Sequence, residues 1–103
     1  MSEATQGRIV YTVRVDRLAE KFIAEQSRKL QKRLFAEIQS LAANPRPAEA
    51  RPITGRKGLY RVRIGNYRIV YLVKDEDLLV LVVRVGHRKE IYEIVKRMMA
   101  GRD

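Results

Sequence analysis

The stretch Leu59–Tyr71, which reads LYRVRIGNYRIVY, decides the fold of this chain. Gly65-Asn66 suits the two-residue turn of a β-hairpin, and apolar and polar residues alternate on both sides of it. We therefore expect two antiparallel strands, over Leu59–Ile64 and Tyr67–Val73. The register follows from the turn, because a two-residue loop fixes which residues lie opposite one another.

This register predicts a cationic face. It sets Arg63 opposite Arg68 and Arg61 opposite Val70, and strand alternation then places the three arginines on one face of the sheet. The other face, directed toward the helices, should carry Tyr60, Val62, Ile64, Ile69 and Tyr71. Directly opposed like charges destabilise a sheet, so three neighbouring arginines favour a site for an anion.

Phosphate suits such a site, since the guanidinium group can bind it through two hydrogen bonds. No acidic residue lies between Glu49 and Asp75, so no nearby carboxylate in the sequence offers a partner for these arginines. The alternative is that the arginines only form a solvated face of the sheet.

The other elements follow from changes in the hydrophobic period. In chain order, we expect a strand over Arg8–Val15, a helix that follows an N-cap at Asp16, a helix over 27–43, a loop to Gly58, an acidic loop at 75–77, a strand over Leu78–Val85 and a helix over 89–100. The core-facing residues should include Ile9, Leu18 and Met98. The order β-α-α-β-β-β-α predicts one α+β domain over residues 1–103, with a small, twisted, mainly antiparallel sheet and the helices packed on one face.

Composition narrows the class of partner. The 103 residues include 22 Lys and Arg against 12 Asp and Glu, a formal net charge of +10. Such a charge is typical of nucleic-acid binding, although an acidic protein or an anionic membrane would also attract it. The chain has no cysteine, which excludes disulfide and thiolate chemistry. The longest apolar run, Leu78–Val83, is too short to span a bilayer. We expect a cytoplasmic protein without a membrane partner.

A second group of candidate residues follows the last strand. Gly86-His87-Arg88 leads into the last helix, and Tyr92 lies one turn further on. His87 is the single histidine, and its unperturbed pKa near 6.5 suits proton transfer. Each residue also has a structural alternative: a packing histidine, a surface arginine and a core tyrosine. We expect no metal and no cofactor, because no metal-ligand cluster or phosphate-binding glycine loop stands out.

Two segments resemble a known family. Leu59–Tyr71 is similar to the central hairpin of the RelE/ParE superfamily of toxin–antitoxin toxins, and Val83–Tyr92 resembles its closing strand and helix. The resemblance covers nearly the whole chain. For a RelE-type toxin it implies a ribosome-dependent endoribonuclease that cuts mRNA in the ribosomal A site by 2′-OH attack. It also implies a cognate antitoxin, an acidic or amphipathic segment that lies over the basic face or displaces the last helix.

The resemblance also implies site residues. RelE-type toxins use two lysines on the first hairpin strand, an arginine on the second, and an arginine and a tyrosine near the end. The corresponding residues here are Arg61, Arg63, Arg68, Arg88 and Tyr92. Both lysines are thus replaced by arginine, which stays protonated and cannot act as a base. The arginines can still bind phosphate and stabilise charge.

Proton transfer then falls to His87 or Tyr92, while Arg68 would clamp the scissile phosphate and Arg88 would stabilise the leaving oxygen. Contacts with ribosomal RNA are expected from Lys29, Lys32, Arg33, Arg56 and Lys57. Two alternatives stay open. One is a ParE-like gyrase inhibitor without nuclease activity, and the other is an RNA-binding module without catalysis.

Overall fold

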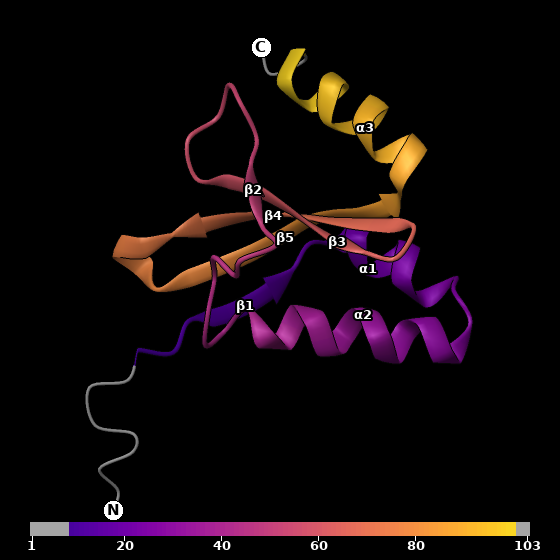
Figure 1. Ribbon diagram of the computed structural model, residues 1–103, viewed down its shortest axis with the longest axis horizontal. Helices are drawn as coiled ribbons and strands as arrows, with labels where there is room; N and C mark the ends of the chain where they lie inside the picture. Colours follow the sequence, from indigo (N-terminus) through magenta and orange to yellow (C-terminus); the bar gives the residue numbers. More distant parts are fainter. Residues whose placement is uncertain (1–8, 101–103) are drawn as a thin grey trace, which may run out of the picture.

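The computed structural model describes residues 9–100, and in this part of the chain three α-helices surround a five-stranded sheet (Figure 1). The strands are β1 (Thr12–Val15), β2 (Arg51–Pro52), β3 (Leu59–Ile64), β4 (Tyr67–Lys74) and β5 (Leu79–His87). The helices are α1 (Arg17–Ala24), α2 (Arg28–Ser40) and α3 (Arg88–Ala100), and a 3-10 turn, η2 (Asp75–Asp77), joins β4 to β5. The predicted α+β fold is confirmed, and β2 is an addition to it.

The sheet has the strand order β1-β5-β4-β3-β2. β1 runs parallel to β5, and the other neighbouring pairs are antiparallel. The predicted hairpin register is confirmed, with Ile64 opposite Tyr67 and Arg63 opposite Arg68. Gly65 in the turn has a φ of 58°, a left-handed conformation that costs glycine little. The register was predictable because the turn and the alternating pattern specify the same pairing.

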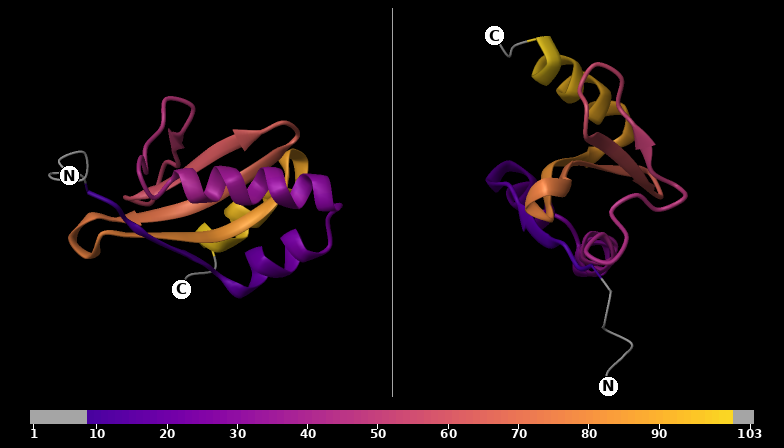
Figure 2. Two further views of the ribbon diagram at one scale, coloured as in Figure 1. Left: turned by 90° about the horizontal axis from the view of Figure 1, so that it is seen from below. Right: turned by 90° about the vertical axis from the view of Figure 1, so that its left-hand side faces the viewer.

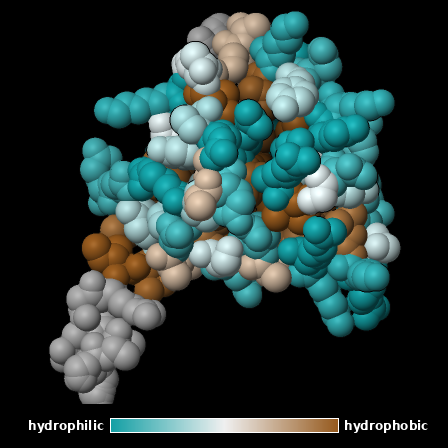
Figure 3. Space-filling model, in the orientation of Figure 1, coloured by the Kyte–Doolittle hydropathy of each residue, from teal (hydrophilic) through white to brown (hydrophobic). Residues whose placement is uncertain are grey.

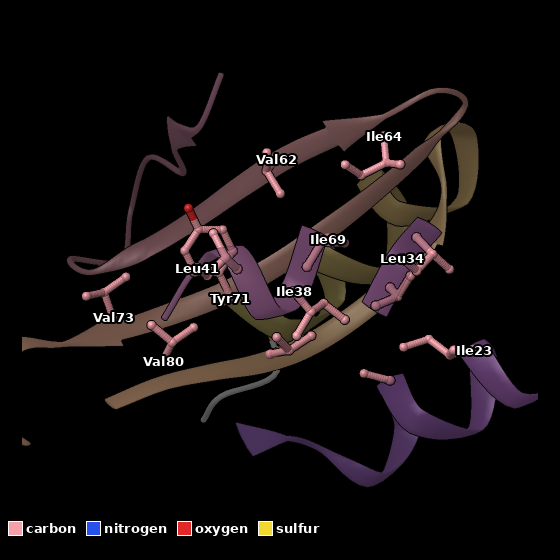
Figure 4. Packing of buried hydrophobic residues seen from close by; sticks show 13 residues of the cluster. Ile23, Leu34, Ile38, Leu41, Val62, Ile64, Ile69, Tyr71, Val73 and Val80 are labelled. Atoms are coloured by element: carbon pink, nitrogen blue, oxygen red, sulfur yellow. The ribbon is translucent and has the colours of Figure 1, made fainter. Parts of the chain in front are cut away.

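The larger core lies between one face of the sheet and helices α1 and α2 (Figure 2). Figure 4 shows its side chains meeting between the sheet and the two helices. The fully buried members include Ile23, Leu34, Leu41, Ile69, Tyr71, Val80 and Val82. Burying one such aliphatic side chain contributes about 1.5–3 kcal/mol relative to exposing it. Helix α2 begins after Ser27, whose hydroxyl accepts a hydrogen bond from the Leu30 amide at 3.2 Å.

Helix α3 lies on the opposite face of the sheet, so the prediction of all helices on one face is wrong in this respect (Figure 1). A second, smaller core of Leu59, Val70 and Ile91 holds it there. The reason is visible in the strands, which are apolar on both faces over part of their length. Because Val70 pairs with Arg61, α3 covers part of the face that carries the arginines. The arginine face is therefore partly walled by a helix.

The N-terminal elements differ from the prediction in their extent. β1 begins at Thr12, and Ile9, predicted to face the core, is 61% exposed. The predicted start of this strand at Arg8 lies outside the described residues. In α1, Leu18 is 49% exposed, and Ala19 occupies the buried position instead. The small Ala19 lets α1 approach the sheet, which an apolar pattern alone could not indicate.

The C-terminal elements also differ in detail. Gly86 was predicted to end the last strand, but β5 continues to His87, and Gly86 pairs with Arg68. A Cβ at Gly86 would lie 3.2 Å from Ile91 Cδ1, so the bare glycine allows α3 to approach closely. Met99, rather than the predicted Met98, packs against the smaller core.

A polar cluster lies at the end of the sheet remote from the hairpin turn. Arg46 Nη2 contacts Asp75 Oδ2 at 2.8 Å, and the Tyr11 hydroxyl donates to Asp75 Oδ1 at 2.6 Å. Arg46 Nε also donates to the Tyr60 hydroxyl at 2.9 Å. The hydrogen bonds from Arg46 and Tyr11 lower the pKa of Asp75, and the bond to Asp75 raises the pKa of Tyr11. This cluster ties the loop after α2 to the turn between β4 and β5.

Candidate RNA-binding and cleavage site

The three hairpin arginines share one face of the sheet. Arg63 and Arg68 are directly paired across β3 and β4, and Arg61 lies two residues from Arg63 on the same strand. Arg63 is exposed, Arg61 is half-buried and Arg68 is only 7% exposed. Within residues 9–100 the two ion pairs are Arg46–Asp75 and Arg84–Asp16, and neither includes these three side chains. The predicted cationic face is present.

Arg68 has an incomplete set of partners. Its Nη1 donates to the carbonyl oxygens of Tyr67 at 3.1 Å and Gly65 at 3.4 Å. Its Nε is buried and has no hydrogen-bond partner. A buried donor without an acceptor costs about 1–3 kcal/mol, and more when it is charged. An anion bound beside Arg68 would supply an acceptor and offset the repulsion from Arg63.

The hairpin turn brings two further cations to this end of the sheet. The Arg88 amide, at the start of α3, donates to the Asn66 carbonyl oxygen at 2.7 Å. From α2, the Arg33 guanidinium approaches Gly65, since a Cβ there would lie 3.4 Å from Arg33 Nη1. Both side chains are exposed. The turn is therefore the point where α2, α3 and the arginine-bearing strands meet.

His87 lies on the other face of the sheet. It pairs with Tyr67, which packs against the larger core, and the two ring centroids are 5.6 Å apart in an edge-to-face arrangement. Its Nδ1 accepts a hydrogen bond from the Lys89 amide at 3.4 Å, at the start of α3. The structure thus gives His87 a packing and capping environment and does not bring it to the arginines.

Tyr92 lies with Arg61 beside a cavity of about 320 Å³ between the sheet, α3 and the segment that follows β2. Tyr92 is 53% exposed. Lys96, one turn further along α3, lines the same cavity. The structure therefore brings Tyr92 to the arginine side of the sheet, as the site prediction requires, and adds Lys96 to the group.

The residues predicted to contact RNA are all exposed but do not form one patch. Lys29, Lys32 and Arg33 lie on α2, on the face of the sheet opposite the arginines. Arg56 and Lys57 line a separate cavity, together with Gly58 and the β4–η2 junction, at the end of the hairpin remote from its turn. Hydrophilic side chains cover most of the surface visible in Figure 3. Positive charge is thus spread over several faces of the described part of the chain.

Three further basic residues were not predicted as site residues from the sequence: Arg51, Arg84 and Lys96. Arg51 pairs with Arg61, and Arg84 pairs with Val70, so these positions continue the row of Arg61 across the sheet. Arg51 donates to the Ala48 and Ala50 carbonyl oxygens, and Arg84 pairs with Asp16 at 3.3 Å. Of the three, only Lys96 could have been predicted from the sequence, because it lies four residues after Tyr92 and so on the same side of the helix. A two-residue strand such as β2 leaves no periodic pattern.

Residues 9–100 contain no group of three or more His, Cys, Asp or Glu side chains that could hold a metal ion. None of the helices described in this structure has the length and apolar character needed to cross a membrane.

Comparison with known proteins identifies the family. Residues 9–92 match the model of the ParE toxin of the type II toxin–antitoxin system parDE. The chain is 37% identical to the mRNA interferase toxin RelE of Escherichia coli over 76 residues, which cover 69% of this chain and 75% of RelE. It belongs to the RelE/ParE superfamily of toxins. The superfamily assignment predicted from the hairpin is therefore confirmed.

Other relatives extend the comparison. Toxin RelG of Mycobacterium tuberculosis is 31% identical over 87 residues, which cover 80% of this chain and 95% of RelG. The putative toxin RelE1 of Methanocaldococcus jannaschii is 36% identical over 59 residues, which cover 54% of this chain and 66% of that protein. These matches support assignment of the chain as a RelE-type toxin of a toxin–antitoxin system.

Solved structures agree with this assignment. The isolated RelE toxin of E. coli superposes with a TM-score of 0.67 and 29% identity, covering 85% of this chain and 98% of RelE. The toxin–antitoxin complex RelBE2 of M. tuberculosis contains a chain with a TM-score of 0.68 and 26% identity, covering 78% of this chain and 93% of that one. The family and the fold thus rest on sequence and structure together.

Proposed function

We propose that this RelE-type toxin is an endoribonuclease that cuts mRNA in the ribosomal A site. In the reaction, the ribose 2′-oxygen bonds to the adjacent phosphorus and the bond to the 5′-oxygen breaks. The products are a 2′,3′-cyclic phosphate and a 5′-hydroxyl; the 2′-hydroxyl loses a proton and the leaving oxygen gains one. The observation that carries the proposal is Arg68, nearly buried, directly opposite Arg63 and with an unpartnered Nε.

The arginines would act by charge stabilisation. Arg68 clamps the scissile phosphate, and Arg61 and Arg63 stabilise the negative charge that builds on it, an effect that preorganised donors provide in many enzymes. Arg88, exposed beside the hairpin turn, stabilises the leaving oxygen. None of the four can accept the 2′-hydroxyl proton, because arginine stays protonated.

Among the predicted site residues, Tyr92 is the proton-exchanging group on the arginine side, whereas His87 lies on the other face. We therefore assign proton transfer to Tyr92 or to groups of the ribosome. The ribosome would also impose the in-line arrangement of the 2′-oxygen and the leaving oxygen, which supplies a large share of such a barrier. Little cleavage of free RNA is then expected.

The same proposal includes the partners. A cognate antitoxin protein would neutralise the toxin, as the RelBE2 complex of a structural neighbour suggests by analogy. It would supply acidic groups to the arginine face or displace α3 from the smaller core. The other partners would be mRNA and ribosomal RNA. A toxin that acts on them would work in the cytoplasm. Lys29, Lys32, Arg33, Arg56 and Lys57 would bind ribosomal RNA phosphates from several sides.

The test uses purified protein and three substrates. The toxin is incubated with programmed ribosomes that carry a defined mRNA codon in the A site, and with the same mRNA free in solution. In a third reaction, it is added to gyrase and a DNA substrate, and supercoiling is measured. We expect a break in the A-site codon on ribosomes, no cleavage of the free mRNA and no inhibition of gyrase. An intact mRNA on ribosomes would overturn the proposal.

Inhibition of gyrase is the second candidate function, and one observation favours it: the family model that matches residues 9–92 is that of the ParE toxin. The arginine face argues against it, because a nuclease has a direct use for three arginines without acidic partners. Loss of supercoiling together with intact mRNA would establish the gyrase function in place of the nuclease.

A further inference from the structure

The cavity that Arg56 and Lys57 line lies at the end of the sheet remote from the hairpin turn. It is bounded by the loop after α2, the turn before β3 and the junction of β4 with η2. Among the described residues that line it, none belongs to α3. Figure 1 shows the β4–β5 turn at the opposite end of the sheet from the start of α3. The volume of about 530 Å³ is within the range of pockets that bind small molecules, and the cavity is separate from the proposed cleavage site.

The turn before β3 holds two cations at this cavity. The Arg56 carbonyl oxygen accepts a backbone hydrogen bond of 3.2 Å across a turn that has Lys57 and Gly58 at its centre. Gly58 has a φ of 85°, which a type II turn requires at this position. The Val73 amide donates to the Gly58 carbonyl oxygen at 2.8 Å, so the turn lies directly against β4. Arg56 and Lys57 are therefore carried by a fixed backbone beside Lys74, which lines the same cavity.

The three cations have no acidic partner in the described part of the chain. The two ion pairs within residues 9–100 are formed by other side chains, and Arg56, Lys57 and Lys74 are all exposed. Neighbouring like charges repel one another, and an anion bound between them offsets the repulsion. A diphosphate suits this wall, because it presents several acceptor oxygens and more than one negative charge to Arg and Lys donors.

Another wall of the cavity is acidic, and one of its carboxylates is available to a ligand. Asp75 is already engaged, by Arg46 at 2.8 Å and by the Tyr11 hydroxyl at 2.6 Å. Glu76 also lines the cavity, is exposed, and belongs to neither ion pair of residues 9–100. A carboxylate accepts hydrogen bonds from hydroxyl groups, including those of a ribose.

The two walls together select the class of ligand. It must present phosphoryl groups to the cations and hydroxyl donors to Glu76. A continuous RNA strand is a poor occupant, because its further phosphates would pass close to the three consecutive acidic residues of η2, Asp75–Asp77. A compact molecule with phosphoryl groups at one end and a ribose at the other avoids this repulsion.

From this arrangement we propose that the cavity binds a nucleoside diphosphate, with its phosphoryl groups on Arg56, Lys57 and Lys74 and its ribose hydroxyls on Glu76. The site goes beyond the proposed nuclease function and uses none of the residues assigned to catalysis. Arg56 and Lys57 are also proposed to contact ribosomal RNA, so a bound nucleotide would compete with that contact.

The test measures binding to the free, full-length protein at constant ionic strength. Methyl NMR spectra are recorded with ADP, with inorganic pyrophosphate as the probe without a nucleoside, and with a single-stranded RNA hexanucleotide. Leu72 and Val73 report on this cavity, and Val95 reports on the arginine side of the sheet. We expect ADP to shift the Leu72 and Val73 signals and to bind more tightly than pyrophosphate, because only ADP offers a ribose.

Exposed residues provide the variants, so the fold should be retained. Lys57→Gln and Lys74→Gln should each weaken ADP binding about 5-fold, the equivalent of about 1 kcal/mol for an exposed charge pair. Lys21→Gln, on α1, removes the same charge elsewhere and should bind ADP normally. Glu76→Ala should weaken binding of ADP but not of pyrophosphate. Asp77→Ala is the matched control, because Asp77 is the next acidic residue and does not line the cavity.

Unchanged Leu72 and Val73 signals in the presence of ADP would overturn the proposal. Equal ADP affinity in Lys57→Gln, Lys74→Gln and Lys21→Gln would also overturn it, since ADP would then bind elsewhere. An equal loss of ADP and pyrophosphate binding in Glu76→Ala would refute the ribose contact. Shifts of Leu72 and Val73 with the hexanucleotide but not with ADP would assign the cavity to an RNA strand instead.

Discussion

Replacing Arg68 with methionine should separate stability from phosphate binding. Arg68 is 7% exposed, lies opposite Arg63 and leaves its Nε without an acceptor. Methionine keeps the apolar stem of the side chain and removes the charge. The substitution therefore tests whether the buried guanidinium serves the fold or a bound anion.

The expected stability change is small because opposing contributions nearly cancel. Removing the unpartnered donor favours the variant by about 1–3 kcal/mol, and removing the repulsion from Arg63 favours it by about 0.2–1 kcal/mol. Against this, the variant loses the hydrogen bonds from Arg68 to the Tyr67 and Gly65 carbonyl oxygens. A hydrogen bond from a charged donor contributes about 1.5–3 kcal/mol when its geometry is good. At 3.4 Å, the bond to Gly65 contributes less. We expect the free energy of unfolding to stay within about 1 kcal/mol of the parent.

The response to phosphate should change much more. A ligand at ten times its Kd stabilises the folded state by about 1.4 kcal/mol, which for a domain of this size corresponds to a rise in Tm of about 6–11 °C. The assay is thermal unfolding of the parent, Arg68→Met and Arg14→Met over a series of phosphate concentrations at constant ionic strength. Arg14→Met is the matched control, because Arg14 is exposed on the edge strand β1.

We expect phosphate to raise the Tm of the parent and of Arg14→Met but not that of Arg68→Met. An equal rise in all three proteins would refute the reasoning, since phosphate would then bind elsewhere. A fall in stability of Arg68→Met by 3 kcal/mol or more would show that Arg68 mainly stabilises the fold.

Other predictions follow from the remaining contacts. Ile91→Ala should destabilise the packing of α3 by about 2–5 kcal/mol; hydrogen exchange should then accelerate in α3 more than in β4, and equal acceleration would mean one cooperative unit. Asp75→Asn should lower Tm at pH 7, and its difference in Tm from the parent should shrink as pH falls below about 4, because a carboxyl whose pKa is lowered in the folded state loses its stabilising effect as it becomes protonated. His87→Ala should leave single-turnover cleavage within about 3-fold of the parent, whereas a fall of about 10²–10⁴-fold would restore His87 as the general acid or base.

The central hairpin was predictable because several local signals agree. The Gly65-Asn66 turn, the alternation and the clustering of arginines all specify one register, and the structure has it. The same register places Arg61, Arg63 and Arg68 on one face of the sheet from the sequence alone. A slip of one residue would have moved all three to the other face.

The placement of α3 was not predictable from its own sequence. Its apolar stripe, which includes Ile91 and Val95, shows that one side of the helix is buried, but not against which face of the sheet. Val70 is the residue that indicates the position of α3. It shares a face with Arg61 and is fully buried, so that face needed a cover. Reading the strands as apolar on both faces would have indicated this.

His87 shows the limit of reading a site from sequence order. It lies between Gly86 and Arg88, next to residues of the proposed site, yet strand alternation directs it to the opposite face with Tyr67. The misleading step was the predicted end of the strand at Gly86. Once β5 extends to His87, alternation applies to the histidine too.

The most direct test of the account is cleavage of an mRNA that carries a single 2′-deoxynucleotide. The substitution is placed at the nucleotide whose 2′-oxygen attacks in the A-site codon of a programmed ribosome, and single-turnover products are mapped against the all-ribose mRNA. The account predicts a break in the all-ribose codon, with a 2′,3′-cyclic phosphate and a 5′-hydroxyl at its ends, and no break at the deoxy position. Cleavage that continues at the deoxy position would contradict 2′-OH attack, and an intact all-ribose mRNA would contradict the nuclease function itself.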